Sequence, residues 1–432
     1  MPGNSRARMR PLRLAAWLAM PILVGCSDDA PEGGSEFTLV QDWVTEPHYE
    51  FGDAMEGDAV FGSVTDVNVH SSAEGLRVYV LDGRSSEVTI WTADGTLIRR
   101  VGRDGPGPGE FQRPFDLVVL QDRFHVSDER RFTTFALDGE FLRTDMVPPS
   151  MSWRGFRLRH EALFADGSVV ATPIVPTRIM AGSMGDDPVD VLPAVRVFRE
   201  ASSWALDTLA VISYRNWVVP FRLPGETLPA NLTQEWVVPD SFRGDPVSGH
   251  AIVARMEAVP PGTLELIEIS LAGDTVWTGQ VRLPPVPIAN DEVEAVVHRT
   301  AAAFASWGGD SMPSQSLRRR VRDAIVVPEA WPVTRGIRVM SNGEIWFRAA
   351  KSDVPSVWYA VPRVDGDGPI KRITLPEWFN PRDVTETHVW GERRDELGIE
   401  YVVGRRIVTP SQDITAKSRR QCNRAPQTEL AE

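Results

Sequence analysis

Long hydrophobic runs and cysteine are scarce in this chain of 432 residues, and their scarcity excludes several classes of protein. The apolar run over residues 14–24 is too short to cross a bilayer of about 30 Å as a helix, so a multi-spanning membrane protein is excluded. The only cysteines are Cys26 and Cys422, and there is no Cys-x-x-Cys motif. With 42% hydrophobic and 24% charged residues, the composition is that of a globular protein with a sizeable core.

Basic residues are also fewer than acidic residues. The 46 lysines and arginines face 59 acidic residues, which gives a formal net charge of −13. An acidic surface of this size argues against nucleic acid and anionic lipid as partners.

The usual signatures of catalysis are also absent, because the chain has no His-Glu-x-x-His, no Gly-x-Ser-x-Gly and no P-loop. The glycines at 105, 107 and 109 alternate with prolines, which have no amide hydrogen to donate to a phosphate. Residues 365–368 begin like a calcium loop, but prolines stand at its fifth and twelfth positions. The seven histidines have no ligand-like spacing. We therefore expect neither a resident metal nor a cofactor.

The first 25 residues have the pattern of a secretory signal, with a basic start followed by a short apolar stretch. The segment ends in Leu-Val-Gly-Cys at residues 23–26, which resembles the bacterial lipobox. That resemblance implies cleavage before Cys26 and attachment of a diacylglycerol to its thiol. Cys422 lies in the polar C-terminal tail and would then have no partner for a structural disulfide.

Cleavage would leave a polar, glycine-containing tether over residues 26–35. It would also lower the formal charge from −13 to −17, since the signal holds four arginines and no acidic residue. By the same resemblance, Ser27 after the cysteine favours the outer membrane. We expect a protein of the bacterial cell envelope, held by a lipid at the outer membrane or on the periplasmic face.

Short alternating apolar segments separated by Gly, Asp and Pro turns fill the rest of the chain, and this pattern predicts β-strands. Residues 67–101 and 117–142 align as two copies of a four-strand unit, with Asp-Gly turns at 94–95 and 138–139. Four strands in such a period are typical of one propeller blade.

Looser copies follow, and the count predicts an all-β, six-bladed propeller over residues 36–410, with a polar tail over 411–432. The last copy is short of strands. Residues 37–53 are expected to complete it, which would close the ring and leave no open sheet edge.

A family resemblance supports this fold. The run Gly-Pro-Gly-Glu-Phe at 107–111 resembles the connections between blades of NHL-repeat-like, TolB-like six-bladed propellers, which are common in bacterial lipoproteins. The segments 128–139 and 389–402 resemble the same family.

One region departs from the strand pattern. Residues 289–327 have helical periodicity, and we expect a helical insertion between blades, packed on one end of the propeller, with Asn290 as a helix cap. Its arginine-rich face is interpreted either as the solvated side of a brace or as a docking site for an acidic partner.

Two kinds of acidic residue recur at equivalent places. The pairs Asp82/Arg84 and Asp128/Arg130 stand in blade turns, where an aspartate commonly binds backbone amides. Asp66 and Asp116 instead precede the predicted innermost strands and, with Asn68, are the candidate residues for a ligand in the central channel. Related lactonase-like and lyase-like propellers hold a metal in that channel.

Two functions follow as hypotheses. The favoured one is a membrane-anchored, extracytoplasmic and non-enzymatic propeller that binds a protein, peptide or glycan of the cell envelope. The alternative is a metal-dependent hydrolase or lyase that uses the channel acids Asp66 and Asp116. A sensor or assembly factor of the envelope is a third, weaker hypothesis. Fold alone does not separate binding from catalysis.

Overall fold

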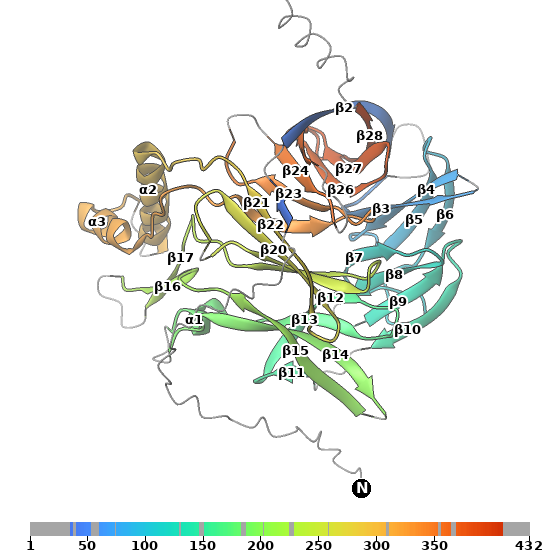
Figure 1. Ribbon diagram of the computed structural model, residues 1–432, viewed down its shortest axis with the longest axis horizontal. Coiled ribbons are helices and arrows are strands. Elements are labelled where there is room, and N and C mark those ends of the chain that lie inside the picture. Colours follow the sequence, from blue (N-terminus) through green and yellow to red (C-terminus); the bar gives the residue numbers. More distant parts are fainter. Residues whose placement is uncertain are drawn as a thin grey trace, which may run out of the picture.

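Six antiparallel sheets follow one another along the chain and stand around a common axis, as the colour sequence in Figure 1 shows. We number these sheets as blades 1 to 6 in chain order. The computed structural model describes residues 35–37, 40–52, 60–73, 75–128, 131–146, 151–182, 187–201, 203–223, 229–257, 259–307, 311–352, 356–363 and 369–408. Within these residues, no helix has the length and apolar character needed to cross a membrane.

The first three blades each run outward from the strand nearest the axis. Blade 1 contains β3 (Val64–Ser72), β4 (Gly75–Asp82), β5 (Glu87–Thr92) and β6 (Leu97–Val101). Blade 2 contains β7 (Pro114–Val119), β8 (Arg123–Asp128), β9 (Arg131–Ala136) and β10 (Phe141–Met146). Blade 3 contains β12 (Phe156–Leu163), β13 (Val169–Pro173), β14 (Val191–Glu200) and β15 (Ser203–Ser213), with the short β11 (Ser152–Trp153) paired to β12.

The last three blades repeat this plan. Blade 4 contains β18 (Ser241–Asp245), β19 (His250–Arg255), β20 (Thr263–Ser270) and β21 (Thr275–Arg282). Blade 5 contains β22 (Thr334–Val339), β23 (Ile345–Ala349), β24 (Val357–Val361) and β25 (Ile370–Thr374). Blade 6 contains β26 (Phe379–Val384), β27 (His388–Arg394), β28 (Glu400–Val408) and the N-terminal strand β2 (Val40–Phe51).

Each blade buries both of its faces against neighbouring blades. On β4, Val78 and Val80 pack in a cluster with Trp390 of blade 6, whereas Tyr79 and Leu81 pack with Phe124 of blade 2. Alternate side chains of a strand point to opposite faces, so an apolar run can serve two interfaces. Equivalent clusters join blades 2 and 3, 3 and 4, 4 and 5, and 5 and 6, so the six-bladed all-β fold is confirmed.

The N-terminal segment closes the ring. The second part of β2 pairs antiparallel with β28, while its first part runs parallel to β25 of blade 5. The preceding β1 (Ser35–Phe37) runs parallel to β21 of blade 4, so the segment covers the outer edges of three blades. At the closure, the buried Arg405 donates from Nε to Thr45 Oγ1 and from Nη2 to the Thr45 carbonyl, both at 2.9 Å. The expected completion of the last blade by residues 37–53 is confirmed.

The helical insertion follows blade 4 and projects from the ring in Figure 1. Its helices α2 (Asn290–Trp307) and α3 (Gln315–Ala324) share an apolar cluster with the hairpin β16 (Val218–Phe221) and β17 (Ala230–Thr233), which follows β15 of blade 3 in the chain. The short helix α1 (Thr177–Met180) lies between β13 and β14. The helices were expected on one end of the propeller, but they pack on this hairpin. Asn290 is the first helical residue rather than the cap, because the Glu292 carboxylate accepts the Ala289 amide at 3.0 Å.

The acids in the blade turns have the structural role expected of them. The Asp82 carboxylate accepts four amides, from Gly62, Ser63, Arg84 and Ser85, at 2.6–3.1 Å. Asp128 accepts the Gln112 amide and pairs with Arg131 at 2.5 Å. These bonds fix the turns that enter and leave a blade.

The closure blade generates a stability prediction. A Cβ added to Gly404 of β28 would lie 2.8 Å from the Trp390 ring, so Gly404→Ala should destabilise the fold by about 1–3 kcal/mol through overpacking. The matched control is Gly336→Ala, whose Cβ would meet nothing closer than Ser241 Oγ at 3.9 Å. Urea unfolding of both variants measures the difference, and equal free energies of unfolding would contradict this account of the closure.

Candidate functional site

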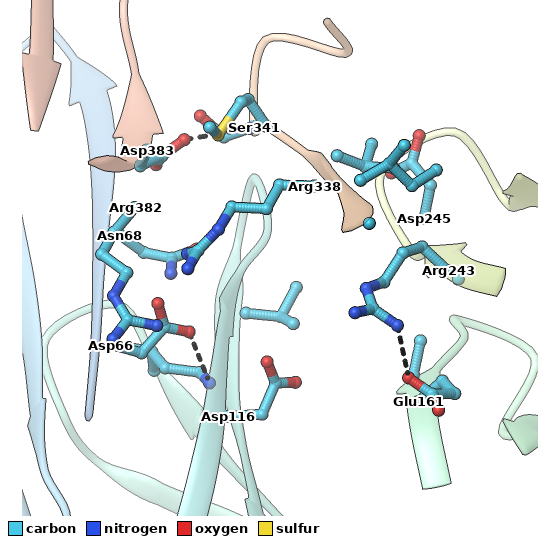
Figure 2. Close-up of a pocket in the computed structure, with 18 of the residues that line it drawn as sticks. Asp66, Asn68, Asp116, Glu161, Arg243, Asp245, Arg338, Ser341, Arg382 and Asp383 are labelled. Carbon is cyan, nitrogen blue, oxygen red and sulfur yellow. Dashed lines mark hydrogen bonds and ion pairs between the residues drawn. The ribbon is translucent and has the colours of Figure 1, made fainter. Parts of the chain in front are cut away.

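The first strand of every blade lines a central cavity of about 740 Å³. Residues of β3, β7, β12, β18, β22 and β26 all contribute to its wall, and Figure 2 shows their side chains converging from different blades. Except where the short β11 pairs with one end of β12, the innermost strand has a neighbouring strand on its outer side only. Its polar side chains can therefore point into the open channel rather than into a packed apolar core.

A shared irregularity directs charged side chains into this cavity. In five of the six innermost strands that the structure describes, the pairing with the second strand shifts register close to a lining residue. The residues at or beside these shifts include Asp66, Asp116, Glu161, Gly336 and Arg382. A β-bulge re-aims side chains and is common beside functional sites.

The structure brings together the three channel residues predicted from sequence. Asp66 and Asn68 on β3 and Asp116 on β7 all line the cavity. Their binding of a ligand remains a prediction. The other predicted site residue, Cys26, lies outside the described residues.

Sequence reasoning found nothing comparable in the later blades, and this was wrong. Glu161 of blade 3, Arg243 of blade 4, Arg338 of blade 5, and Arg382 with Asp383 of blade 6 also line the cavity. A signal was present for two of them, because Glu161 and Asp383 each precede an apolar strand residue, as Asp66 and Asp116 do. The arginines follow no such repeat.

The two predicted acids have unusual proton affinities. Burial is the main cause that raises the pKa of Asp66 from its usual 3.8 to about 6, against the opposing effect of Arg382. Burial and the nearby Asp66 and Glu161 raise the pKa of Asp116 to about 7. Both side chains are only half-buried by exposed area, since they face the cavity from deep within the ring.

Several charges of the cavity wall are already engaged. Asp383 accepts the amides of Val69, Ser341 and its neighbour Val384 at 2.8–3.0 Å, which links blades 5, 6 and 1. Arg382 donates two hydrogen bonds to Glu392, at 2.7 and 2.8 Å. Glu161 pairs with Arg159 at 2.9 Å and with Arg243 at 3.4 Å.

Arg338 and Asp116 are different. Within the described residues Arg338 forms no ion pair, and its one hydrogen bond, to Asn380 Oδ1, is long at 3.4 Å. Burial and the positive charge of Arg382 lower its pKa to about 10, which still leaves it charged at neutral pH. Asp116 accepts one long hydrogen bond, from Ser127 Oγ at 3.5 Å. The cavity thus holds a cation and an acid that the protein leaves without close partners of opposite charge.

The donor set does not fit a resident metal ion. In the part of the chain that the structure describes, no three His, Cys, Asp or Glu side chains gather as a metal-binding group. The guanidinium groups of Arg243, Arg338 and Arg382 share the cavity with the acids and would repel a cation. The cavity therefore gives no support to the metal-dependent alternative.

The raised pKa of Asp116 generates a pH prediction. Because the folded state binds the proton more tightly than the unfolded state, this group makes the protein less stable as the pH rises from about 4 to about 7. Asp116→Asn should therefore raise the Tm by roughly 2 °C at about pH 8 and by less at about pH 4.

Asp122→Asn serves as the control for this Tm comparison, because Asp122 is exposed and paired with its neighbour Arg123 at 2.6 Å. An Asp116→Asn variant with the same pH profile as the wild type would show that the carboxyl has an ordinary pKa.

A family model that matches part of the chain agrees with the architecture. No curated protein matches the sequence. Among solved structures, a candidate exported protein from Bacteroides fragilis NCTC 9343 is 9% identical, with a TM-score of 0.44 over 85% of this chain and 99% of that chain. A DUF4221-family protein from Bacteroides vulgatus is 7% identical, with a TM-score of 0.46 over 85% and 98%. Virginiamycin B lyase from Staphylococcus aureus is 8% identical, with a TM-score of 0.38 over 83% and 98%. A family model described as a 6-bladed beta-propeller matches residues 58–163, and with the observed order of strands the chain is a six-bladed β-propeller.

Proposed function

We propose that this protein is an extracytoplasmic, lipid-anchored propeller that binds a protein, peptide or glycan of the bacterial cell envelope in its central channel, without catalysing a reaction. The observation that carries the proposal is the charged cavity on the axis. Its volume of about 740 Å³ lies within the range of roughly 300–1,000 Å³ typical of ligand sites.

The state of the cavity side chains supports binding rather than structure alone. A half-buried guanidinium without a carboxylate partner loses hydration and gains little from the protein, which is costly unless a ligand supplies the missing charge. Arg338 is such a group, and Asp116 is its acidic counterpart. Acids with a structural role in this protein, such as Asp82, are instead saturated with amide hydrogen bonds.

The proposed extracytoplasmic, lipid-anchored location is supported by the sequence. The basic start, the short apolar stretch and the Leu-Val-Gly-Cys ending form a lipoprotein signal in the proper order, and the tether that follows would separate the ring from the membrane.

Blocking the channel tests the binding site. Gly336 lines the cavity and has open space beside it, so Gly336→Trp should fill part of the cavity without straining the backbone. We expect the full-length variant to lose at least about tenfold in affinity for whichever envelope glycan or peptide the wild type selects from an array.

The control for this experiment is Leu397→Trp, at a residue that is 85% exposed and outside the cavity lining. Binding that survives Gly336→Trp as well as it survives Leu397→Trp would place the ligand elsewhere and overturn the proposed site.

The anchor has its own test. Cys26→Ser should abolish incorporation of labelled fatty acid and move the protein from the membrane fraction to the soluble fraction, because only a thiol accepts the lipid. Cys422→Ser, the only other cysteine substitution that the chain offers, should leave both unchanged. Labelling that persists in Cys26→Ser would refute lipidation at this residue.

A further inference from the structure

The charges in the channel are unevenly distributed among the blades. The innermost strands of blades 1, 2 and 3 contribute three acids and one arginine: Asp66, Asp116, Glu161 and Arg159. Those of blades 4, 5 and 6 contribute four arginines and two acids: Arg243, Arg335, Arg338, Arg382, Asp245 and Asp383. The blades follow in order around the ring, so the mainly acidic half faces the mainly basic half across the axis.

The two halves meet at two places, and there the charges partly compensate each other. Glu161 pairs with Arg243 where blades 3 and 4 meet. Arg382 lies beside Asp66 where blades 6 and 1 meet, as Figure 2 shows. Charged groups at these two places therefore have opposite charges close by.

The middle strand of each half carries a charged group that forms no ion pair. Opposite charges act on both groups from farther away, because Arg243 opposes the rise in the pKa of Asp116 and Asp66 opposes the fall in the pKa of Arg338. Asp116 belongs to blade 2 and Arg338 to blade 5, which stand on opposite sides of a six-bladed ring, and Figure 2 shows the Arg338 side chain extending across the cavity toward Asn68, with Asp116 below it. No ion pair joins either group to another residue within the described part of the chain. Of the other charged groups in the lining, Asp245 pairs with Arg363, Arg335 with Glu235 and Arg159 with Glu161, while Asp383 accepts three amides. Arg348 also lines the cavity and forms no ion pair within the described residues, but it is exposed.

We infer that the ligand of this channel is a zwitterion, a free amino acid or short peptide whose carboxylate contacts Arg338 and whose ammonium group contacts Asp116. The inference rests on the proposed function and gives it a chemical class. A zwitterion supplies both missing charges at once, and a carboxylate is the group that a guanidinium binds with the best geometry.

Ligands with charge of one sign fit less well. A purely anionic ligand would gain from Arg338 but would face the mainly acidic strands of blades 1 to 3. A cation would face the mainly basic strands of blades 4 to 6 in the same way. The separation of charge across the axis, rather than the net charge of the wall, thus selects the ligand.

Blocked peptides test this inference on the full-length chain. Isothermal titration would compare alanine, alanyl-alanine, its N-acetyl form, its C-terminal amide and the doubly blocked form. We expect alanine or alanyl-alanine to bind, whichever separation of charges fits the cavity, and each single block to weaken the binding of alanyl-alanine by at least about tenfold. Alanine against alanyl-alanine distinguishes a free amino acid from a peptide.

Two variants assign the contacts. Arg338→Gln should remove the preference for a free carboxylate over an amide, and Asp116→Asn should remove the preference for a free amine over an acetylated one. The matched controls are Arg123→Gln and Asp122→Asn on the exposed ion pair of blade 2, which should keep both preferences.

Three results would each overturn the inference. They are equal binding of free and doubly blocked peptides, preferences that survive both channel variants, and no binding of any probe at millimolar concentration. Gly336→Trp separates this failure from that of the proposed function. If an envelope glycan or protein still binds and is lost in Gly336→Trp, the channel is a binding site for another class of ligand. If no binding of any kind responds to Gly336→Trp, the proposed site falls as well.

Discussion

The pairing of β2 with β28 is the constraint on which the rest of the structure depends. This pairing joins residues at the two ends of the described chain and gives blade 6 its outermost strand. Further contacts cross the same seam, because Glu400 of β28 accepts the Val64 amide of β3, and Asp383 of β26 accepts the Val69 amide. An open ring would expose the Trp390 cluster between blades 6 and 1 and would leave the inner strands without a common axis. Closure therefore creates the channel as well as the fold.

Once the ring is closed, the innermost strands have two separate tasks. Their apolar side chains hold neighbouring blades together, as Val67 and Leu117 do in two adjacent clusters. Their polar side chains turn toward the axis at the register shifts. Asp66 shows how one residue combines both, since its carboxylate lines the cavity and also accepts the Leu117 amide of the next blade at 3.2 Å. Asp116 lacks an equivalent amide bond and keeps its proton more readily.

The sequence predicts more of the fold than of the site, and particular residues show why. Blades 1 and 2 repeat their turns at a fixed spacing, so their strands and the acids Asp66 and Asp116 could be located from local pattern alone. The innermost strands β18 and β26 were missed because they are short and contain Gly244 and Pro381, which weaken a strand pattern. Arg243 and Arg382 lie on these strands and were missed with them. Arg338 lies on β22, but only the three-dimensional ring shows that it lines the same cavity as Asp116 and forms no ion pair within the described residues.

The order of charges around the ring also explains how an acidic protein can bind a ligand that carries a carboxylate. The net charge of −13 acts at long range and is weakened by salt, whereas the cavity is shielded by protein on every side but its mouths. Inside it, the five acids and six arginines of the lining nearly cancel in total charge, but acids predominate on one half of the ring and arginines on the other. Two opposite charges held apart by rigid strands form a fixed dipole, and the field of such a dipole orients a ligand with complementary ends more than it attracts one with a single charge. Because the position of each charge is set by the blade that carries it, the closed ring determines the spacing that a ligand must match.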